Sequence, residues 1–397
     1  MITDPNRFGV YRTAGLDYVN KGDALTVATL MNTPVSWHFN DEIYSSFDWR
    51  VPIDTPLTEL YRQRAQQLRD QYDYVSLFFS GGVDSANILH AFIDNGILLD
   101  EVVMFKPFSQ ETNDQDHDPR NLYGEIDHAA IPHLKQYIND PRTTVRMIDM
   151  EASTKHYLNN SHLLDQFNRV SCFGSASVAR AGATFTDAVW RGLYEQGKNV
   201  AHVQGIDKPV IQYINGEYVF AFDESATISS QFDPGSRTAE TEMITKHHHH
   251  EFFYWTPNLP QLVIKQCQVV KQLCMNSLVH RLLFSMSELP MQDRIMRLIH
   301  EIYPAHVNAI RNRFCTRKQS SAGLLASHHQ WIYRYTDPNT QGAWRDIITN
   351  LQTTIDDRFF VQDKSWWYDA NSAPAQKTVQ PIKKFQYKFF TSRRYQL

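Results

Sequence analysis

The amino-acid sequence predicts an α/β protein whose core is a doubly wound, parallel β-sheet. Segments rich in β-branched and aromatic residues alternate with amphipathic segments of helical length, which is the pattern of consecutive strand–helix–strand units. Strands are predicted over residues 74–79, 101–105, 143–149 and 199–205, and helices over residues 57–71, 86–93, 121–139 and 184–196. The first of these strands (YVSLFF) is largely apolar at successive positions, as expected for a strand covered by helices on both faces.

The composition is that of a globular protein and argues against broad electrostatic binding of polyanions. Of 397 residues, 42% are hydrophobic and 21% are charged, and the formal net charge is -4. A negative net charge disfavours capture of nucleic acid or of an anionic membrane by the molecule as a whole. The four cysteines form no CxxC pair, the first residues contain no apolar signal segment, and no apolar run reaches the ~20 residues of a membrane-spanning helix. We therefore expect a cytoplasmic protein without a membrane partner.

Changes in composition divide the chain into four predicted regions. Residues 1–55 mix short apolar runs with turn formers and predict a small α+β module, and residues 56–222 contain the parallel sheet. Two β-like runs around Asn215 and Gly216 predict a hairpin, because Asn-Gly is the strongest short hairpin signal. Residues 223–256 are polar and predict a mobile connection, whereas residues 257–397 are expected to be mainly helical and to shape the site of a second substrate.

Two biased segments lie in the C-terminal half. Residues 247–250 are four consecutive histidines, which cannot all face one metal ion, so we expect a solvated loop or an expression artefact there. Residues 383–390 (KKFQYKFF) interleave basic and aromatic side chains. This pattern is typical of single-stranded nucleic-acid binding, and it is equally consistent with a C-terminal strand packed on the protein, which the net charge favours.

The clearest chemical motif is SGGVDS at residues 80–85, between a predicted buried strand and a predicted helix. Consecutive glycines let the backbone approach phosphate oxygens closely, and the following helix directs unpaired N–H groups and a positive dipole end at an anion. The serine hydroxyls can donate further hydrogen bonds to phosphate. Because Asp84 is repelled by a bare phosphate, it is expected to act through a bound Mg²⁺. The alternative is a Gly-Gly turn capped by Asp and Ser, which the strand–loop–helix context disfavours.

This hexapeptide resembles the PP-loop of the N-type ATP pyrophosphatases, and in particular the synthetase domain of asparagine synthetase. The resemblance covers about residues 72–210, and it implies cleavage of ATP between the α- and β-phosphates with transfer of AMP. It implies that ATP and pyrophosphate are held by Ser80, Gly81, Gly82, Asp84 and Ser85. It also implies that the end of the second strand contacts adenine, through Val103, Met104 and Phe105, although ordinary strand packing explains these three residues equally well.

Further acidic and basic residues are candidates for the same site. Residues 205–209 (GIDKP) follow a predicted strand, so they are expected at the carboxyl edge of the sheet, where ligands bind. The Gly-x-Asp of this segment resembles an acidic loop of asparagine synthetase, which implies that Asp207 is a second Mg²⁺ ligand beside Asp84. Lys208 is a candidate for contacting phosphate, and a plain turn before Pro209 is the alternative for both residues. Glu125 is a candidate second catalytic acid, and Lys265 is a candidate for neutralising pyrophosphate; a solvated glutamate and a surface lysine are the more common roles of such residues.

The resemblance implies an ATP- and Mg²⁺-dependent ligase that adenylates a carboxylate or carbonyl oxygen for attack by a nitrogen nucleophile. The chain begins with Met1 and its first cysteine is Cys172, so no built-in glutaminase is expected. The nitrogen would come from ammonia, from an amine on a small-molecule acceptor, or from a partner glutaminase. One alternative is modification of a nucleobase in tRNA or DNA through an adenylated intermediate, and another is a non-catalytic nucleotide-binding module. The acceptor and the oligomeric state are not predicted.

Overall fold

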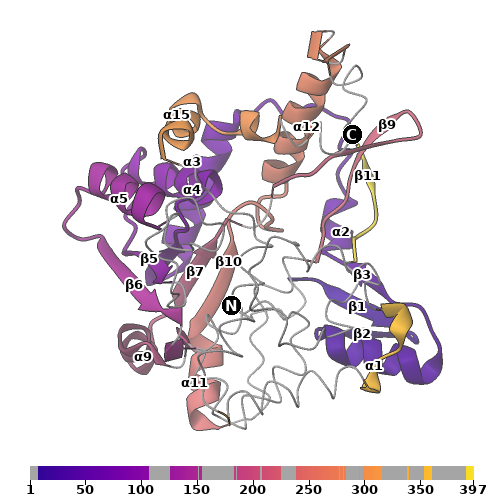
Figure 1. The fold of residues 1–397 in the computed structure, drawn as a ribbon, viewed down its shortest axis with the longest axis horizontal. Helices are drawn as coiled ribbons and strands as arrows, with labels where there is room; N and C mark the ends of the chain where they lie inside the picture. The colour runs from indigo at the N-terminus through magenta and orange to yellow at the C-terminus, as the bar shows by residue number, and fades with distance from the viewer. Residues whose placement is uncertain are drawn as a thin grey trace.

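The computed structural model places a five-stranded parallel sheet at the centre of the described part of the chain (Figure 1). The structure describes residues 8–106, 126–150, 152–153, 183–184, 186–205, 208–224, 238–276, 278–279, 281–282, 295, 298–314, 338, 353–359 and 390–397. From one edge to the other, the strands of the sheet are β10 (His248–Phe252), β7 (Val200–Gln204), β4 (Tyr74–Phe78), β5 (Glu101–Lys106) and β6 (Thr144–Asp149). Every pair is parallel, so the predicted α/β class is confirmed.

The strand order reverses direction between β4 and β7. The chain runs outward from β4 through β5 to β6, and then returns to the other side of β4 as β7 and β10. In open parallel sheets of this kind, the crevice outside the carboxyl ends of the two strands at the reversal is the usual ligand-binding place. The loops that follow β4 and β7 therefore border the place where a ligand is expected to bind.

Helices cover the sheet on both faces. They are α3 (Leu57–Gln71), α4 (Val83–Ile93), a short π-helical turn η2 (Ile126–Ala130) continued by α5 (Ile131–Tyr137), α9 (Ala188–Glu195) and α11 (Ala239–His247). Side chains on the two faces of β10 contact different helices: Tyr194 of α9 hydrogen-bonds to His248, whereas Arg64 of α3 pairs with Glu251. Burial on both faces explains why the central strand β4 is apolar at nearly every position.

The histidine run is not a solvated loop, and residues 238–256 are not a mobile connection. Residues 248–252 form β10, and all five are buried against β7 and the flanking helices. The Tyr194 hydroxyl lies 2.9 Å from His202 Nε2 and 2.8 Å from His248 Nδ1, and Gln204 Nε2 lies 2.9 Å from His250 Nδ1. Each of these three imidazoles thus has at least one bonded ring nitrogen, although His202 Nδ1 has no hydrogen-bond partner among the described residues. Neutral imidazoles with such partners are tolerated in a strand core, which polarity of the sequence alone does not predict.

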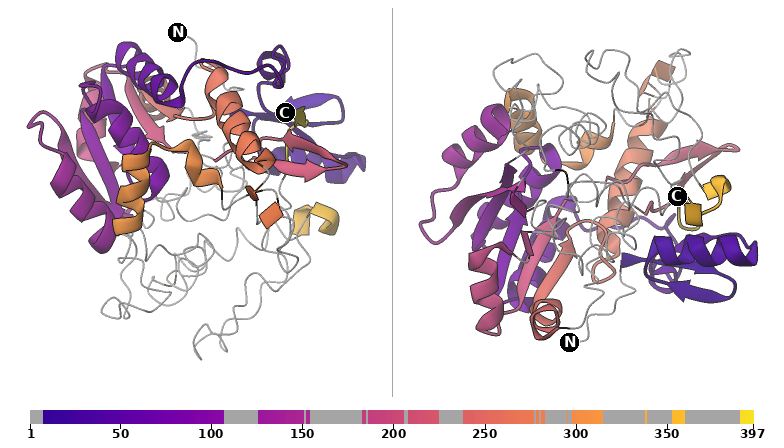
Figure 2. Two further views of the ribbon diagram at one scale, coloured as in Figure 1. Left: turned by 90° about the horizontal axis from the view of Figure 1, so that it is seen from above. Right: turned by 60° about the horizontal axis from the view of Figure 1, so that its bottom comes forward.

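Two smaller sheets lie on the same side of the central one (Figure 2). The N-terminal sheet has the order β2-β1-β3 and is antiparallel, and the other has the order β11-β9-β8. The predicted hairpin is confirmed: Asn215 and Gly216 join β8 to β9 with φ angles of 52° and 88°. The bounds of these elements are β1 (Val10–Thr13), β2 (Leu16–Tyr18), α1 (Lys21–Met31), β3 (Ser36–His38), α2 (Asp41–Tyr44), β8 (Gln212–Ile214), β9 (Glu217–Phe220) and β11 (Tyr395–Gln396).

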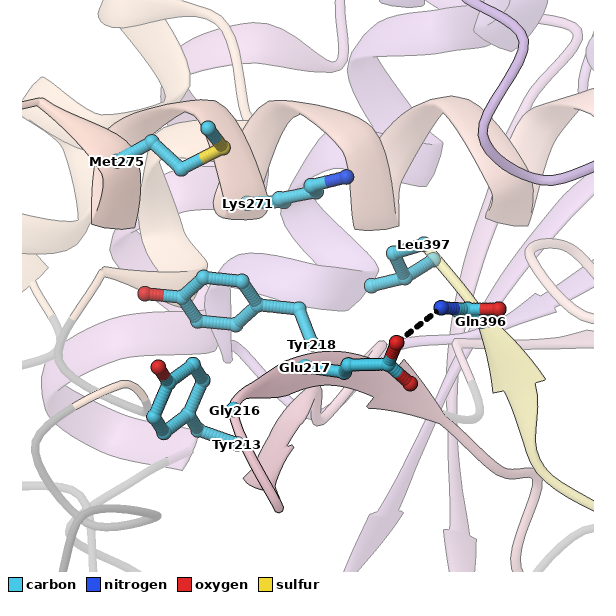
Figure 3. A pocket seen from close by; sticks show the side chains of 8 residues that line it. All are labelled: Tyr213, Gly216, Glu217, Tyr218, Lys271, Met275, Gln396 and Leu397. Carbon is cyan, nitrogen blue, oxygen red and sulfur yellow. Dashed lines mark hydrogen bonds between the residues drawn. The ribbon is translucent and has the colours of Figure 1, made fainter.

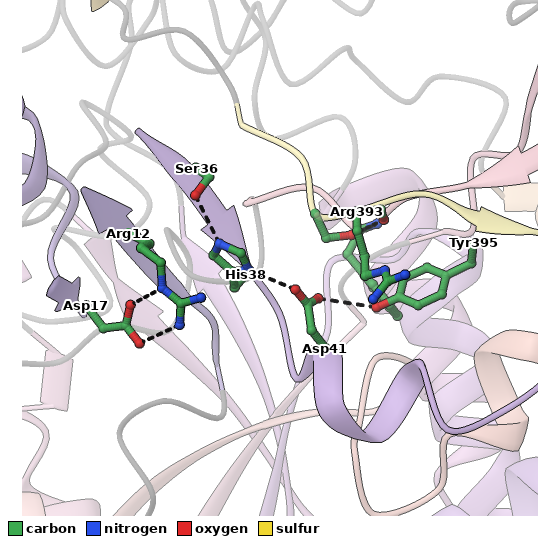
Figure 4. A network of polar contacts seen from close by, with 9 residues as sticks. Arg12, Asp17, Ser36, His38, Asp41, Arg393 and Tyr395 are labelled. Atoms are coloured by element: carbon green, nitrogen blue, oxygen red, sulfur yellow. Dashed lines mark hydrogen bonds and ion pairs between the residues drawn. The ribbon is translucent and has the colours of Figure 1, made fainter. Parts of the chain in front are cut away.

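A polar network connects the N-terminal sheet to the last residues of the chain (Figure 4). His38 Nδ1 lies 2.8 Å from Asp41 Oδ2, and the Tyr395 hydroxyl donates to Asp41 Oδ1 over 3.3 Å. Ser36 Oγ lies 2.9 Å from the other ring nitrogen of His38. The end of the chain is therefore packed against the beginning. Residues 383–389 of the basic and aromatic tail lie outside the described residues.

The described parts of the C-terminal region consist mainly of helices and helical turns. They are α12 (Gln261–Met275), a 3₁₀ turn η3 (Ile299–Ile302), α15 (Ala305–Phe314) and a 3₁₀ turn η4 (Asp357–Phe359). α12 packs on α3, where Gln266 Nε2 donates to the Tyr61 hydroxyl over 3.1 Å. Among the residues that the structure describes, no helix combines the length and apolar character needed to cross a bilayer.

Candidate functional site

The SGGVDS loop occupies the turn from β4 into α4, as the sequence predicts. Gly81 has a φ angle of +79°, in the left-handed region that side chains rarely adopt. A Cβ atom at this position would lie 2.8 Å from the backbone nitrogen of Ala130, at the end of η2. Both the backbone conformation and the close approach of a second chain segment therefore require glycine here.

The hydroxyls and backbone groups of the loop form hydrogen bonds with one another. The Gly82 N–H donates to Ser80 Oγ over 3.3 Å, and Ser85 Oγ donates to the carbonyl of Gly82 over 3.0 Å. Gly82 is the N-cap of α4 and has no side chain to cap the first turn. The N-terminal N–H groups of α4 are thus left for another acceptor, which is the arrangement that binds phosphate at a helix terminus.

Asp84 is the charged centre of this region. Lys208 Nζ lies 3.0 Å from Asp84 Oδ2, with side-chain exposures of 23% for Lys208 and 19% for Asp84. The Tyr303 hydroxyl donates to Asp84 Oδ1, and the Tyr254 hydroxyl donates to the Asp84 backbone carbonyl over 2.8 Å. The carboxylate is oriented by two groups and is still reached by solvent.

Two tyrosines of this region were not predicted from the sequence. Tyr254 follows β10 and Tyr303 follows η3, about 170 and 219 residues from Asp84 along the chain. Burial raises the pKa of both phenols, and the Asp84 charge raises it further, so both remain protonated donors at neutral pH. Neither belongs to a local motif, and only the packing of distant segments brings them to the loop.

Residues 205 and 208, which follow β7, lie at the carboxyl edge of the sheet beside the loop that follows β4. A Cβ atom on Gly205, directly after β7, would lie 3.2 Å from Asp84 Cβ, and Lys208 reaches the Asp84 carboxylate. The two loops therefore touch at the reversal of the sheet. Asp207 and Glu125 lie outside the described residues, and their roles stay predictions.

The remaining predicted residues differ in their access to a ligand. Val103 and Met104 of β5 are buried in the core. Phe105 is partly exposed at the end of the strand and contacts Phe78 edge-to-face with ring centroids 5.0 Å apart. Lys265 of α12 donates to the carbonyl of Ile53, and no contact with Asp84 is seen among the described residues. Phe105 is thus the one of the three strand residues whose side chain a base could reach.

A separate cavity of about 550 Å³ lies between the β8–β9 hairpin, α12 and β11 (Figure 3). The rings of Tyr213 and Tyr218 lie 4.9 Å apart on one wall, and Lys271 projects from α12 opposite them. Gln396 Nε2 donates to Glu217 Oε1 over 2.6 Å at the other end. None of the predicted site residues lines this cavity.

No protein-family model matches the chain, and no curated protein matches it. The chemical capacity of the site therefore follows from its own groups. It offers uncapped helix N–H groups, two serine hydroxyls, a part-exposed carboxylate and a lysine ammonium at one edge of a parallel sheet. These are the groups that bind a polyphosphate together with its cation.

Proposed function

We propose that this protein is a PP-loop ATP pyrophosphatase acting as an AMP-forming ligase. The observation that carries the proposal is the position of the SGGVDS sequence, which follows the central strand of a five-stranded parallel sheet at the reversal of the strand order. The contact of Asp84 with Lys208 from the neighbouring strand's loop supports it further. The activated group would be a carboxylate or carbonyl oxygen of a small molecule.

In this proposal the loop binds the β- and γ-phosphates of ATP. The free N–H groups of the first turn of α4 and the hydroxyl of Ser80 donate to phosphate oxygens. Lys208 then leaves Asp84 and contacts the phosphates, because an ammonium gains more from a polyanion than from one carboxylate. Gly81 is required for this conformation of the loop, because a Cβ atom at its position would clash with Ala130.

The residues present fit a magnesium ion. Asp84 Oδ2 already accepts a cationic partner and its side chain is part-exposed, and Mg²⁺ is usually held by one or two carboxylates together with substrate phosphates. Asp84 would hold the ion, with Asp207 as the predicted second ligand. When bound, Mg²⁺ offsets negative charge on the departing pyrophosphate. The Tyr303 hydroxyl keeps the Asp84 carboxylate in one orientation for this role.

The test is the fate of ATP labelled at the α-phosphate. The chain with Mg²⁺ and a panel of small acids and amines is expected to release labelled AMP and pyrophosphate, and Asp84→Asn is expected to lower the rate at least ~10²-fold because it removes a charge that positions the cation. Asp70→Asn, an exposed aspartate on α3 that accepts from Gln66, is the matched control and is expected to keep full activity.

Other outcomes assign other functions. Labelled AMP that appears only when tRNA or DNA is added would indicate modification of a nucleobase. Release of ADP instead of AMP, or unchanged turnover in Asp84→Asn, would contradict the proposed chemistry. Tight ATP binding without cleavage under every condition would indicate a nucleotide-binding module.

A further inference from the structure

A cluster of three histidines and one aspartate lies at the far end of α4 from the phosphate loop. His90 and Asp94 are one turn apart at the end of α4, and His306 is in the first turn of α15. His133, from α5, faces His90 from the buried side. Three helices that are separate in sequence thus bring imidazole and carboxylate groups to one place.

The spacing of three of these groups suits a metal ion. His90 Nδ1 lies 3.0 Å from Asp94 Oδ1, and His306 Nε2 lies 2.9 Å from Asp94 Oδ2. One ligand atom from each of the three residues lies within 4.8 Å of those of the other two. Two ligands bound to one zinc ion at about 2.0–2.1 Å in tetrahedral geometry stand roughly 3.3 Å apart, so little movement would be needed to close the site.

His133 supplies the outer partner that metal-binding histidines usually have. His133 Nε2 lies 3.3 Å from His90 Nε2, and both rings are buried. A metal on His90 Nδ1 leaves the ring proton on Nε2, and this proton is then donated to His133 Nε2. A ligand histidine almost always donates its other N–H in this way, which fixes its tautomer and orientation.

The same contacts also form a metal-free hydrogen-bond network, with Asp94 accepting from both His90 and His306. Two features favour a metal. The donor set of two imidazoles and one carboxylate, presented from two helices, is typical of Zn²⁺ and related transition metals. The outer side is open, because the side chains of Asp94 and His306 are 43% and 54% exposed, so an ion and a completing water can reach it.

We propose that His90, Asp94 and His306 bind one divalent transition-metal ion of the zinc type, with His133 orienting His90. The ion would join the beginning of α15 to the end of α4. Tyr303 lies three residues before His306 and donates to Asp84, so the joined segment is also the one that orients the carboxylate of the phosphate loop. The metal site itself does not depend on the proposed function.

The test is titration of the EDTA-treated full chain with Zn²⁺ by calorimetry and with Co²⁺ by electronic absorption. We expect one tight ion per chain and the intense d–d bands of a low-symmetry, nitrogen-containing cobalt site. His306→Ala and Asp94→Ala are exposed enough to leave the fold intact, and each is expected to weaken binding at least ~100-fold because each removes a direct ligand. His133→Asn is expected to weaken it about 10–100-fold through loss of the outer partner.

His38→Ala is the matched control. His38 pairs with Asp41 over 2.8 Å, much as His90 pairs with Asp94, but no second imidazole is found beside that pair among the described residues. Its removal is expected to leave Zn²⁺ affinity and stoichiometry unchanged. Equal affinity in wild type, His306→Ala and Asp94→Ala would overturn the proposal and would assign any bound zinc to other histidines, such as those of β10.

Discussion

Two lysine–carboxylate pairs of this protein have opposite surroundings. Lys208 and Asp84 meet at the carboxyl edge of the sheet with about a fifth of each side chain exposed, whereas Lys21 and Glu224 have side-chain exposures of 1% and 0%. Glu224 also accepts from the Tyr11 hydroxyl over 2.6 Å and from the Phe390 N–H over 2.9 Å. One pair is open to exchange partners, and the other is enclosed by partners on every side.

The difference shows how the same chemical pair serves two purposes. The enclosed pair joins α1, residue 224 and the C-terminal segment, and its charges have no solvent to compensate a lost partner. The open pair contributes little to stability because water screens it. It can therefore be rearranged when a phosphate or a cation arrives, which is what a binding site requires.

The largest expected effect is the loss of stability when Lys21 of the enclosed pair is replaced. Lys21→Met leaves the Glu224 carboxylate buried without its cation, so the free energy of unfolding is expected to fall by about 3–5 kcal/mol. The matched change Lys208→Met is expected to cost less than about 1 kcal/mol. Urea unfolding of both variants measures the difference. Similar losses in the two would contradict the distinction between the pairs.

Gly81 and Gly96 both have positive φ angles but differ in the space around them. Gly81→Ala and Gly96→Ala both strain a left-handed backbone, by about 1–2 kcal/mol each. Only Gly81 would also clash, with the Ala130 nitrogen at 2.8 Å, whereas nothing lies within 4 Å of a Cβ on Gly96. Gly81→Ala is therefore expected to cost about 1–3 kcal/mol more than Gly96→Ala, measured by thermal or urea unfolding. If the two costs are equal, the loop does not press against η2.

The smallest expected effect is on the pH dependence of stability, and it concerns the buried imidazole of His202 in β7. Burial lowers the pKa of His202 well below its ordinary value, and His250 lowers it further, so the native protein keeps this imidazole neutral. The unfolded chain takes up that proton below about pH 6.5. The neutral His202 imidazole therefore contributes to the free energy of unfolding above that pH. This contribution is lost as the pH falls, by at most about 1.4 kcal/mol per pH unit.

His202→Gln is expected to flatten this acid dependence, because the amide does not titrate. Urea unfolding between pH 7 and pH 5 for wild type and variant is the measurement. An identical slope in both would assign the acid dependence to other buried imidazoles, such as His133, whose pKa burial lowers to about 4.

Local patterns in the sequence predicted much of the fold and the position of the SGGVDS loop between β4 and α4. Four of the five central strands and the Asn215–Gly216 hairpin were predicted, because apolar runs and turn residues carry their signal within a few positions. β10 was missed because its histidines are polar by composition and become core residues only through partners such as Tyr194 and Gln204. Tyr303 was missed because its contact with Asp84 joins residues 219 positions apart.

The sequence by itself determined the α/β class, the strand–loop–helix setting of residues 80–85 and the need for glycine in that loop, because these depend on short-range periodicity and backbone sterics. Only the tertiary structure decided that Lys208 meets Asp84, that Lys21 and Glu224 form an enclosed pair, and that His90, Asp94 and His306 converge. Such contacts depend on the order of strands and the packing of helices, which are set by burial summed over the whole chain.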